Sequence, residues 1–109
     1  MSDRPISPKY TPALTEAIID ILPDQSIGLS TVDFTNPSAA PVYLHLFDGA
    51  AGDNTIDAPK YVLGCGSAST YGRDLHRMTF PNGLSAALSA AEGSAVAASA
   101  PISWGWGAV

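Results

Sequence analysis

Charge is scarce in this 109-residue chain. Charged residues make up 14% of the sequence, whereas the apolar share is an ordinary 46%. An average soluble domain carries about a quarter of its residues as charges, so much of this surface must consist of Ala, Ser, Thr, Gly and Pro. A neutral surface suits packing against other chains better than it suits an isolated monomer. We therefore expect the protein to assemble with itself or with other proteins.

Basic residues and long hydrophobic runs are also lacking. Five Lys and Arg residues stand against ten Asp and Glu, which gives a net charge of −5. Without a basic patch the chain cannot neutralise a phosphate backbone, so we expect no nucleic-acid partner. No apolar run is long enough to span a bilayer, and the first residues lack the apolar core of a signal peptide. We expect a protein made in a cytoplasm, with no membrane partner.

Residue types used in catalysis and metal binding are few. The single cysteine, Cys65, excludes an internal disulfide, and the surrounding YVLGCGS predicts a small buried apolar residue rather than a reactive thiol. His45 and His76 lie in predicted strands and lack the spacing of a zinc site. Each has an acidic neighbour, Asp48 or Asp74, but no GxSxG motif marks a nucleophilic serine. We expect no enzyme, no catalytic residue, no cofactor and no metal.

Two loops resemble ligand-binding motifs. DGAAGDNTID, residues 48–57, concentrates carboxylate and amide oxygens of the kind that calcium binds. The same residue types are turn formers, so a solvated loop is the preferred interpretation. GCGSAS, residues 64–69, resembles the start of a dinucleotide fingerprint but lacks its third glycine and a following helix, and we reject it.

Short alternating runs dominate the chain and predict strands. They cover residues 27–34, 41–47, 60–65, 74–80 and 102–106, and Gly, Asn, Asp and Pro turns separate them, with residues 66–74 expected as a loop. Residues 13–22 fit helix and strand spacing, and the β-branched isoleucines favour a strand. This pattern predicts an all-β fold, a small antiparallel β-sandwich that is jelly-roll-like or immunoglobulin-like.

The two ends of the chain differ from this pattern. Pro5, Pro8 and Pro12 remove amide donors, so residues 1–12 are expected to form an extended arm that is free to lie on a neighbour, with residues 13–109 as the sandwich domain. For the Ala and Ser tract at residues 85–100, the sequence is compatible with a helix, a strand or a loop. Alanine favours a helix, whereas Gly93 and the serines interrupt one.

One predicted strand has two apolar faces. In PVYLHLF, Val42, Leu44 and Leu46 point to one side, and the opposite face carries rings. A small sheet usually needs only one apolar face, so the second must be covered by another element of the chain or by a neighbouring subunit. The low charge and the free arm favour the neighbour. The tryptophans near the carboxyl end offer a platform for a sugar ring, but such pairs more often belong to a core or a subunit interface. The predicted interface residues are Tyr43, His45, Phe47, Trp104 and Trp106.

Two segments carry a resemblance to a known group of proteins. FTNPSAAPVYLHLFDG, residues 34–49, resembles the "N-t-s-a-a-p-v-Y-L-k-L-y-D" stretch of small tailed-bacteriophage virion proteins. FPNGLSAALS, residues 80–89, is similar to the later "f-p-n-G-l-s" segment of that group. The proline-rich arm and the Ala and Ser tract depart from the pattern. The resemblance implies a β-sandwich structural protein of the virion and names no catalytic residue.

Composition and resemblance together predict a function. We expect a phage virion structural protein, a capsid decoration or cement protein that binds the outer capsid surface. Its partners would be the major capsid protein or other virion proteins, together with further copies of itself in a homo-oligomer such as a trimer. A phage tail or head-fibre component is the alternative within this class. A carbohydrate-binding module that uses Trp104 and Trp106 is an alternative from another class, followed by a small hydrolase.

Overall fold

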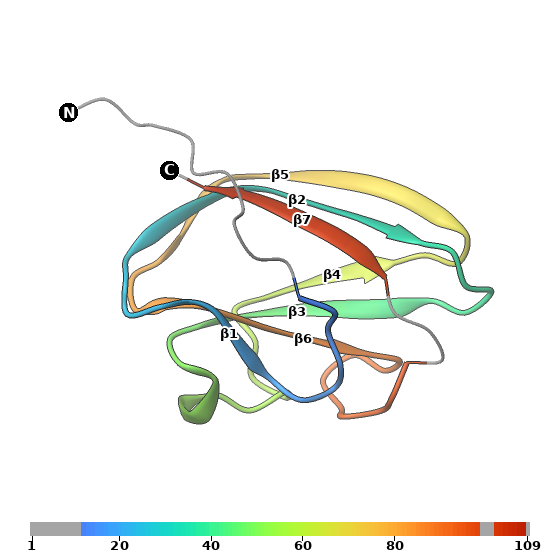
Figure 1. Cartoon of the computed structure of the whole chain (residues 1–109), viewed down its shortest axis with the longest axis horizontal. Coiled ribbons are helices and arrows are strands. Elements are labelled where there is room, and N and C mark those ends of the chain that lie inside the picture. Colours follow the sequence, from blue (N-terminus) through green and yellow to red (C-terminus); the bar gives the residue numbers. More distant parts are fainter. Residues whose placement is uncertain (1–11, 99–101, 109) are drawn as a thin grey trace.

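The protein is built from seven strands in two sheets. The computed structural model describes residues 12–98 and 102–108. The strands, with one 3-10 turn, are β1 (Ile19–Pro23), β2 (Ile27–Asn36), β3 (Val42–Asp48), η1 (Ala51–Asp53), β4 (Tyr61–Cys65), β5 (Ser69–Phe80), β6 (Gly83–Ser89) and β7 (Ser103–Ala108). A four-stranded sheet, β1-β6-β3-β4, packs on a three-stranded sheet, β5-β2-β7, with antiparallel pairing throughout (Figure 1). The predicted small antiparallel β-sandwich is confirmed.

The core fills the space between the two sheets. Strand residues alternate in direction, so every second side chain of each sheet points toward the other sheet. Removing these apolar side chains from water supplies the main driving force for folding. The core contains Leu14, Ile21, Ile27, Leu29, Val32, Phe34, Val42, Leu44, Leu46, Leu63, Cys65, Leu75, Phe80, Leu84, Ala86, Leu88, Ile102, Trp104, Trp106 and Ala108.

The segment before β1 closes one side of the sandwich without forming a strand. The sequence predicts a strand that includes residues 13–18, but regular pairing starts only at Ile19. Leu14 is buried in the core, and the carbonyl of Thr15 accepts a hydrogen bond from the backbone N–H of Leu88. This hydrogen bond holds the segment against β6, where the segment packs without regular strand pairing.

The predicted loop at residues 66–74 is wrong beyond Ala68. The backbone from Ser69 to Asp74 pairs in register with β2, and Gly72 lies opposite Asp33. The Gly, Ser and Thr content that suggested a loop reflects a strand with an exposed face, where no apolar alternation is required.

The Ala and Ser tract begins as a strand. Leu84, Ala86 and Leu88 point into the core, and the small side chains between them point to the opposite face. The preceding Pro81-Asn82-Gly83 turn is confirmed. Gly83 has a φ of +116°, and a Cβ there would lie 2.7 Å from the carbonyl oxygen of Leu22. Only glycine fits this turn.

The side chain of Asn36 joins the β2–β3 turn to the end of β4 through hydrogen bonds. Its side chain is fully buried, and Nδ2 donates toward the carbonyls of Ala40, Cys65 and Gly66 at 3.0 to 3.2 Å. Oδ1 accepts from the backbone N–H of Ser38 at 3.1 Å and from its hydroxyl at 2.8 Å. Both ends of the amide are therefore used, which an Asp or a Ser at this position could not reproduce.

The predicted arm lies outside the described residues, except for Pro12, whose carbonyl contacts the domain. In the described part of the chain, no helix has the length and hydrophobicity that crossing a bilayer requires.

Candidate interaction surfaces

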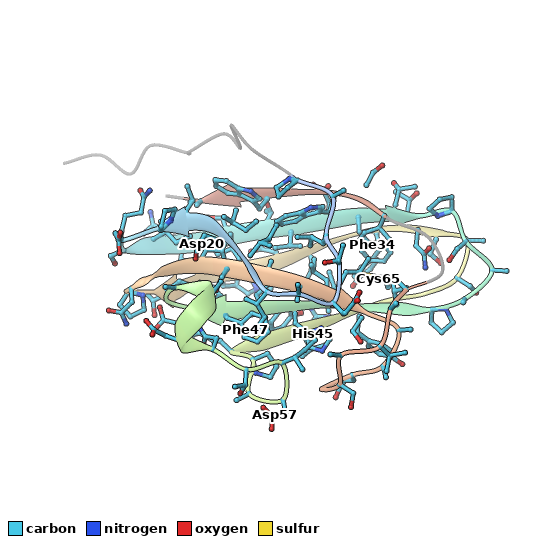
Figure 2. All side chains as sticks on the ribbon, turned by 60° about the horizontal axis from the view of Figure 1, so that its bottom comes forward. Asp20, Phe34, His45, Phe47, Asp57 and Cys65 are labelled. Atoms are coloured by element: carbon cyan, nitrogen blue, oxygen red, sulfur yellow. The ribbon has the colours of Figure 1, made fainter. Side chains whose placement is uncertain are left out.

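The outer face of β3 is covered by the chain itself. His45 and Phe47 are fully buried within a single copy. Figure 2 shows both side chains on the side of the four-stranded sheet that faces away from the other sheet, whereas Phe34 lies between the sheets. The expectation that a neighbouring subunit covers these two residues is therefore wrong. Tyr43, farther along the same face, is half-buried.

Loop 90–98, which follows β6, supplies part of this cover. Nε2 of His45 accepts a hydrogen bond from the backbone N–H of Gly93 at 3.0 Å, so Nδ1 carries the proton and donates to the carbonyl of Tyr43 at 3.0 Å. Ser89 Oγ fastens the same loop, because it accepts from the backbone N–H groups of Ala91 and Val96. Burial lowers the pKa of His45 below its ordinary 6.5, although the Tyr43 carbonyl and the charge of Glu92 oppose this effect.

Small residues on β6 make room for the rings of β3. In the antiparallel register Tyr43 lies opposite Ser89, His45 opposite Ala87, and Phe47 opposite Ser85. Directly opposite residues share one face of a sheet, so each ring lies beside a side chain of one or two heavy atoms. His45 and Phe47 also stack, with ring centroids 6.3 Å apart and planes at 10°. The small side chains of the Ala and Ser tract therefore leave space for the aromatic rings of β3.

Trp104 and Trp106 belong to the core. Their exposed fractions are 8% and 3%, so the side chains offer no platform for a sugar ring. Nε1 of Trp104 donates to the carbonyl of Pro12 at 2.9 Å. Within the described part of the chain, Nε1 of Trp106 is buried without a hydrogen-bond partner. Of the two interpretations open for this pair, the core is confirmed, and a direct interface role for these side chains is not supported.

The glycines of β7 leave space for side chains of the neighbouring strand β2. A Cβ at Gly105 would lie 3.0 Å from Oδ1 of Asp33, and one at Gly107 would lie 2.9 Å from Oγ1 of Thr31. The side chains of β2 therefore lie over the glycine positions of β7. These glycine positions thus accommodate Asp33 and Thr31.

The outer face of the three-stranded sheet carries only short side chains on the part that precedes the bulge in β5. Cross-strand pairing places Asp33 between Gly72 and Gly105, with Thr31 and Thr35 on either side of Asp33 along β2. No large apolar and no basic side chain lies among these positions. The nine residues of this face, which we call the flat face, are Thr31, Asp33, Thr35, Thr70, Gly72, Asp74, Ser103, Gly105 and Gly107.

Strand β5 is the long edge of the same sheet. It has 12 residues and pairs with β2, and no other described strand pairs with its second side. Residues 70–74 are all exposed. A bulge interrupts the pairing between Asp74 and Met78, where His76 and Arg77 have φ values of +51° and +60°. Sequence reasoning missed this edge because it assigned residues 66–74 to a loop.

The loops between strands provide no chemical site. An open depression of about 410 Å3 is lined by Asp24, Gly49, Ala50, Asp53, Pro81 and Asn82. Asp48 holds Asn82 through the backbone N–H at 2.9 Å and Nδ2 at 3.1 Å, and Thr55 donates to Asp57 at 2.6 Å, so part of the candidate calcium loop is used internally. No group of three or more His, Cys, Asp and Glu residues within residues 12–98 and 102–108 is arranged to hold a metal.

The remaining candidate groups lie apart from one another. Cys65 is buried, and burial raises the pKa of its thiol to about 11, as expected of an inert core cysteine. Nδ1 of His76 lies 3.7 Å from Asp74 Oδ1, and the two side chains are 86% and 65% exposed. Such an exposed pair has no enclosed space in which to act on a substrate.

Comparison of the chain with protein-family models, with curated proteins and with solved structures finds no match. The geometry of the described residues is therefore the basis for any functional argument.

Proposed function

We propose that this chain is a virion structural protein of a tailed phage, and that it decorates the outer capsid surface in many copies. The observation that carries the proposal is the flat face, where nine neighbouring positions bear only Gly, Ser, Thr and Asp. Its partner would be the major capsid protein. The protein's contribution would be mechanical, with no chemical step.

A face of small side chains suits contact with a second broad surface. Short side chains lose little conformational entropy when they are covered, because they have few rotamers. They also leave backbone and hydroxyl groups within reach of a partner, and polar groups of this kind can be satisfied directly or through interfacial water. The low charge of the whole chain, 14%, reduces the desolvation cost of such a contact.

The charge of the flat face indicates the complementary chemistry of the partner. Asp33 and Asp74 are its two acidic residues, and both are exposed. Their carboxylates require hydrogen-bond donors or basic side chains on the capsid surface, because a buried charge without a partner is costly. We expect the contacted capsid surface to be neutral or basic.

Repetition compensates for weak individual contacts. Each copy would gain roughly 25 cal/mol for every Å2 of apolar surface that it buries. A contact of modest area therefore gives a modest affinity, but many copies that also touch one another bind with higher avidity than one copy alone. This arrangement reinforces a shell against internal pressure without a large interface per copy.

The direct experiment uses phage particles that lack the chain. Purified protein should bind these particles in a saturable and symmetric manner, and electron microscopy should show added density on the outer capsid surface. Density on the tail or on head fibres would instead support the alternative within the class. Absence of the chain from particles of a phage that encodes it would contradict the proposal.

Neither of the other candidate classes gains support from the structure. The carbohydrate-binding module depends on exposed tryptophans, and both tryptophans are buried. The hydrolase depends on a histidine beside a serine nucleophile, whereas His45 is engaged by Tyr43 and Gly93 in the described fold.

A further inference from the structure

Among the described strands, none pairs with the outer edge of β5. We propose that β5 of one copy pairs antiparallel with β5 of a second copy about a two-fold axis at Gly72, so that two three-stranded sheets join into one six-stranded sheet. This pairing does not depend on the proposed function, because it concerns only the edge of the sandwich. It would place the flat faces of both copies side by side on one surface.

The edge is open and lacks most of the usual protection against pairing. Strand edges are commonly blocked by proline, by lysine, by a bulge or by a covering loop. Residues 70–74 are all exposed and contain neither proline nor lysine; the charge of Arg73, opposite the buried Val32, is the protective feature that this run retains. Tyr71 is 47% exposed, one of the two exposed large hydrophobic residues among those described. The bulge at His76 blocks only the far end of the strand.

The backbone itself defines the length and centre of the contact. Ala68 and His76 have left-handed φ values of +48° and +51°, so the extended run between them is Ser69–Leu75. The centre of this run is Gly72. A two-fold axis perpendicular to the sheet and passing through Gly72 uses every residue of the run, and it brings two glycines together where no side chains obstruct the approach.

Neighbouring registers are less favourable. Side chains directly opposite each other in an antiparallel pair share a face. The two-fold axis of a symmetric pair must therefore pass through a residue, which then lies opposite the same residue of the second copy. An axis at Arg73 sets two guanidinium groups opposite each other, and an axis at Asp74 sets two carboxylates opposite each other. An axis at Tyr71 would set Ala68 opposite Asp74, and because the left-handed backbone of Ala68 cannot continue a strand, the pairing would shrink to residues 69–73.

The Gly72 register brings complementary side chains together. Arg73 lies opposite Tyr71 of the second copy, and the same contact occurs twice because of the symmetry. A guanidinium over a tyrosine ring is a favourable cation–π pair. On the flat face, the hydroxyl of Thr70 lies opposite the carboxylate of Asp74 of the second copy and can donate to it. No like charges face each other.

The contact is small, so the dimer should dissociate on dilution. Pairing of seven residues buries less than the roughly 1,200 Å2 of a standard protein interface. Sedimentation velocity of the full chain, measured from micromolar to about millimolar concentration, should therefore show a reversible monomer–dimer equilibrium.

Tyr71→Lys tests the register of the β5–β5 pairing by introducing a contact between like charges. It sets a lysine opposite Arg73 twice in each dimer, so the dimer should weaken at least tenfold. Val96→Lys is the matched control, because Val96 is 46% exposed and lies in loop 90–98, away from β5; it should dimerise as the unmodified chain does. The double variant Tyr71→Lys with Arg73→Asp should dimerise again, because each lysine then faces an aspartate.

Gly72→Cys tests the axis independently of charge. A Cβ at Gly72 lies 3.7 Å from Cβ of Asp33, an ordinary contact, so the variant should fold. At the axis the two Cα atoms would be about 4.5 to 5.5 Å apart, within reach of a disulfide. Oxidation should give a covalent dimer. Cys65 should not compete because it is buried and its thiol pKa is raised to about 11.

Thr70→Cys is the control for this cross-link. Position 70 lies two residues from the axis, so the two substituted positions of the dimer would be separated by about four residues, roughly 13 Å, too far for a disulfide. A chain that stays monomeric up to millimolar concentration, or a cross-link at Thr70→Cys equal to that at Gly72→Cys, would overturn the proposal.

Discussion

Nε2 of His45 and the backbone N–H of Gly93 form a 3.0 Å hydrogen bond that joins the outer face of β3 to loop 90–98. The bond requires a neutral imidazole with its proton on Nδ1, because Nε2 must accept. A second proton on His45 would turn Nε2 into a donor and set it against the Gly93 N–H. Protonation should therefore release the loop.

The first prediction follows from this bond and concerns pH. The unfolded imidazole takes up a proton near 6.5, whereas burial lowers the pKa of His45 in the folded protein. The stabilisation is therefore complete above pH 6.5 and declines as the pH falls from there to the lower folded pKa. The unfolding free energy should fall as the pH falls through this range, with a slope whose upper limit for one proton is about 1.4 kcal/mol per pH unit. Urea unfolding between pH 4.5 and 7.5 measures it.

Two glutamine variants provide the comparison for this prediction. His45→Gln keeps an acceptor for Gly93 but cannot be protonated, so it should flatten the slope. His76→Gln, at a side chain that is 86% exposed, should leave the slope unchanged. A slope that survives in His45→Gln would exclude His45 as its source.

The second prediction concerns the amide of Asn36. Asn36→Asp keeps the shape of the side chain but replaces Nδ2, which donates to three carbonyls, with an acceptor. We expect a loss of at least about 3 kcal/mol at pH 7, because a buried carboxylate would then face carbonyl oxygens. Ser38→Ala removes the hydroxyl's bonds to Asn36 Oδ1 and to the Ala40 backbone but leaves the Asn36 amide in place, and it should cost about 1 kcal/mol. Equal costs in chemical denaturation would contradict this account of the turn.

The third prediction reverses the sequence-based expectation for the outer face of β3. A neighbour covering Phe47 would leave the monomer stable after truncation, but Phe47 is fully buried in one copy. Phe47→Ala should therefore destabilise the monomer by about 3 to 5 kcal/mol. Tyr43→Ala, at a half-buried position of the same face, should cost clearly less. Thermal unfolding of dilute protein distinguishes the two outcomes.

The fourth prediction concerns the amino-terminal arm. Deletion of residues 1–11 should leave the melting temperature unchanged and weaken binding to particles, since three prolines disfavour sheet pairing in residues 1–12. Deletion through Leu14 should also destabilise the fold. It removes the Pro12 carbonyl that accepts from Trp104 and a leucine that is 4% exposed, which costs about 2 to 5 kcal/mol in a core. Unchanged particle binding after the shorter deletion would remove the arm from the proposal.

The sequence was sufficient for the fold class because short apolar runs are separated by clear turn residues. PVYLHLF and KYVLGC were predicted correctly as strands, and Pro81-Asn82-Gly83 as a turn, from these signals. Residues 66–74 were assigned to a loop because an exposed edge strand needs no apolar alternation. The Ala and Ser tract was ambiguous because its composition is fixed by the rings of Tyr43, His45 and Phe47 on the adjacent strand. Such a tertiary requirement leaves no local signal.

The candidate surfaces were less predictable than the fold. Apolar residues suggested an interface at Phe47 and Trp106, and both turned out to be buried in the monomer. On the flat face, Thr31 and Asp33 alternate with the buried Val32 and Phe34 within IGLSTVDF, but the bulge between Leu29 and Thr31, which puts Leu29 in the core, has no signal in this run. What the sequence could not show is that Gly72 and Gly105 flank Asp33, because this depends on the register of three strands.

The most direct test of the central claim is whether the flat face holds the protein on the capsid. Thr35→Arg places a large cation on the central strand of this face, and Ala95→Arg places the same charge on an exposed position of loop 90–98. Both variants should fold, and co-sedimentation with particles lacking the chain measures their affinity. We predict that Thr35→Arg loses at least about tenfold in affinity, or 1.4 kcal/mol, while Ala95→Arg binds as the unmodified chain does. Equal binding of the two variants would contradict the account.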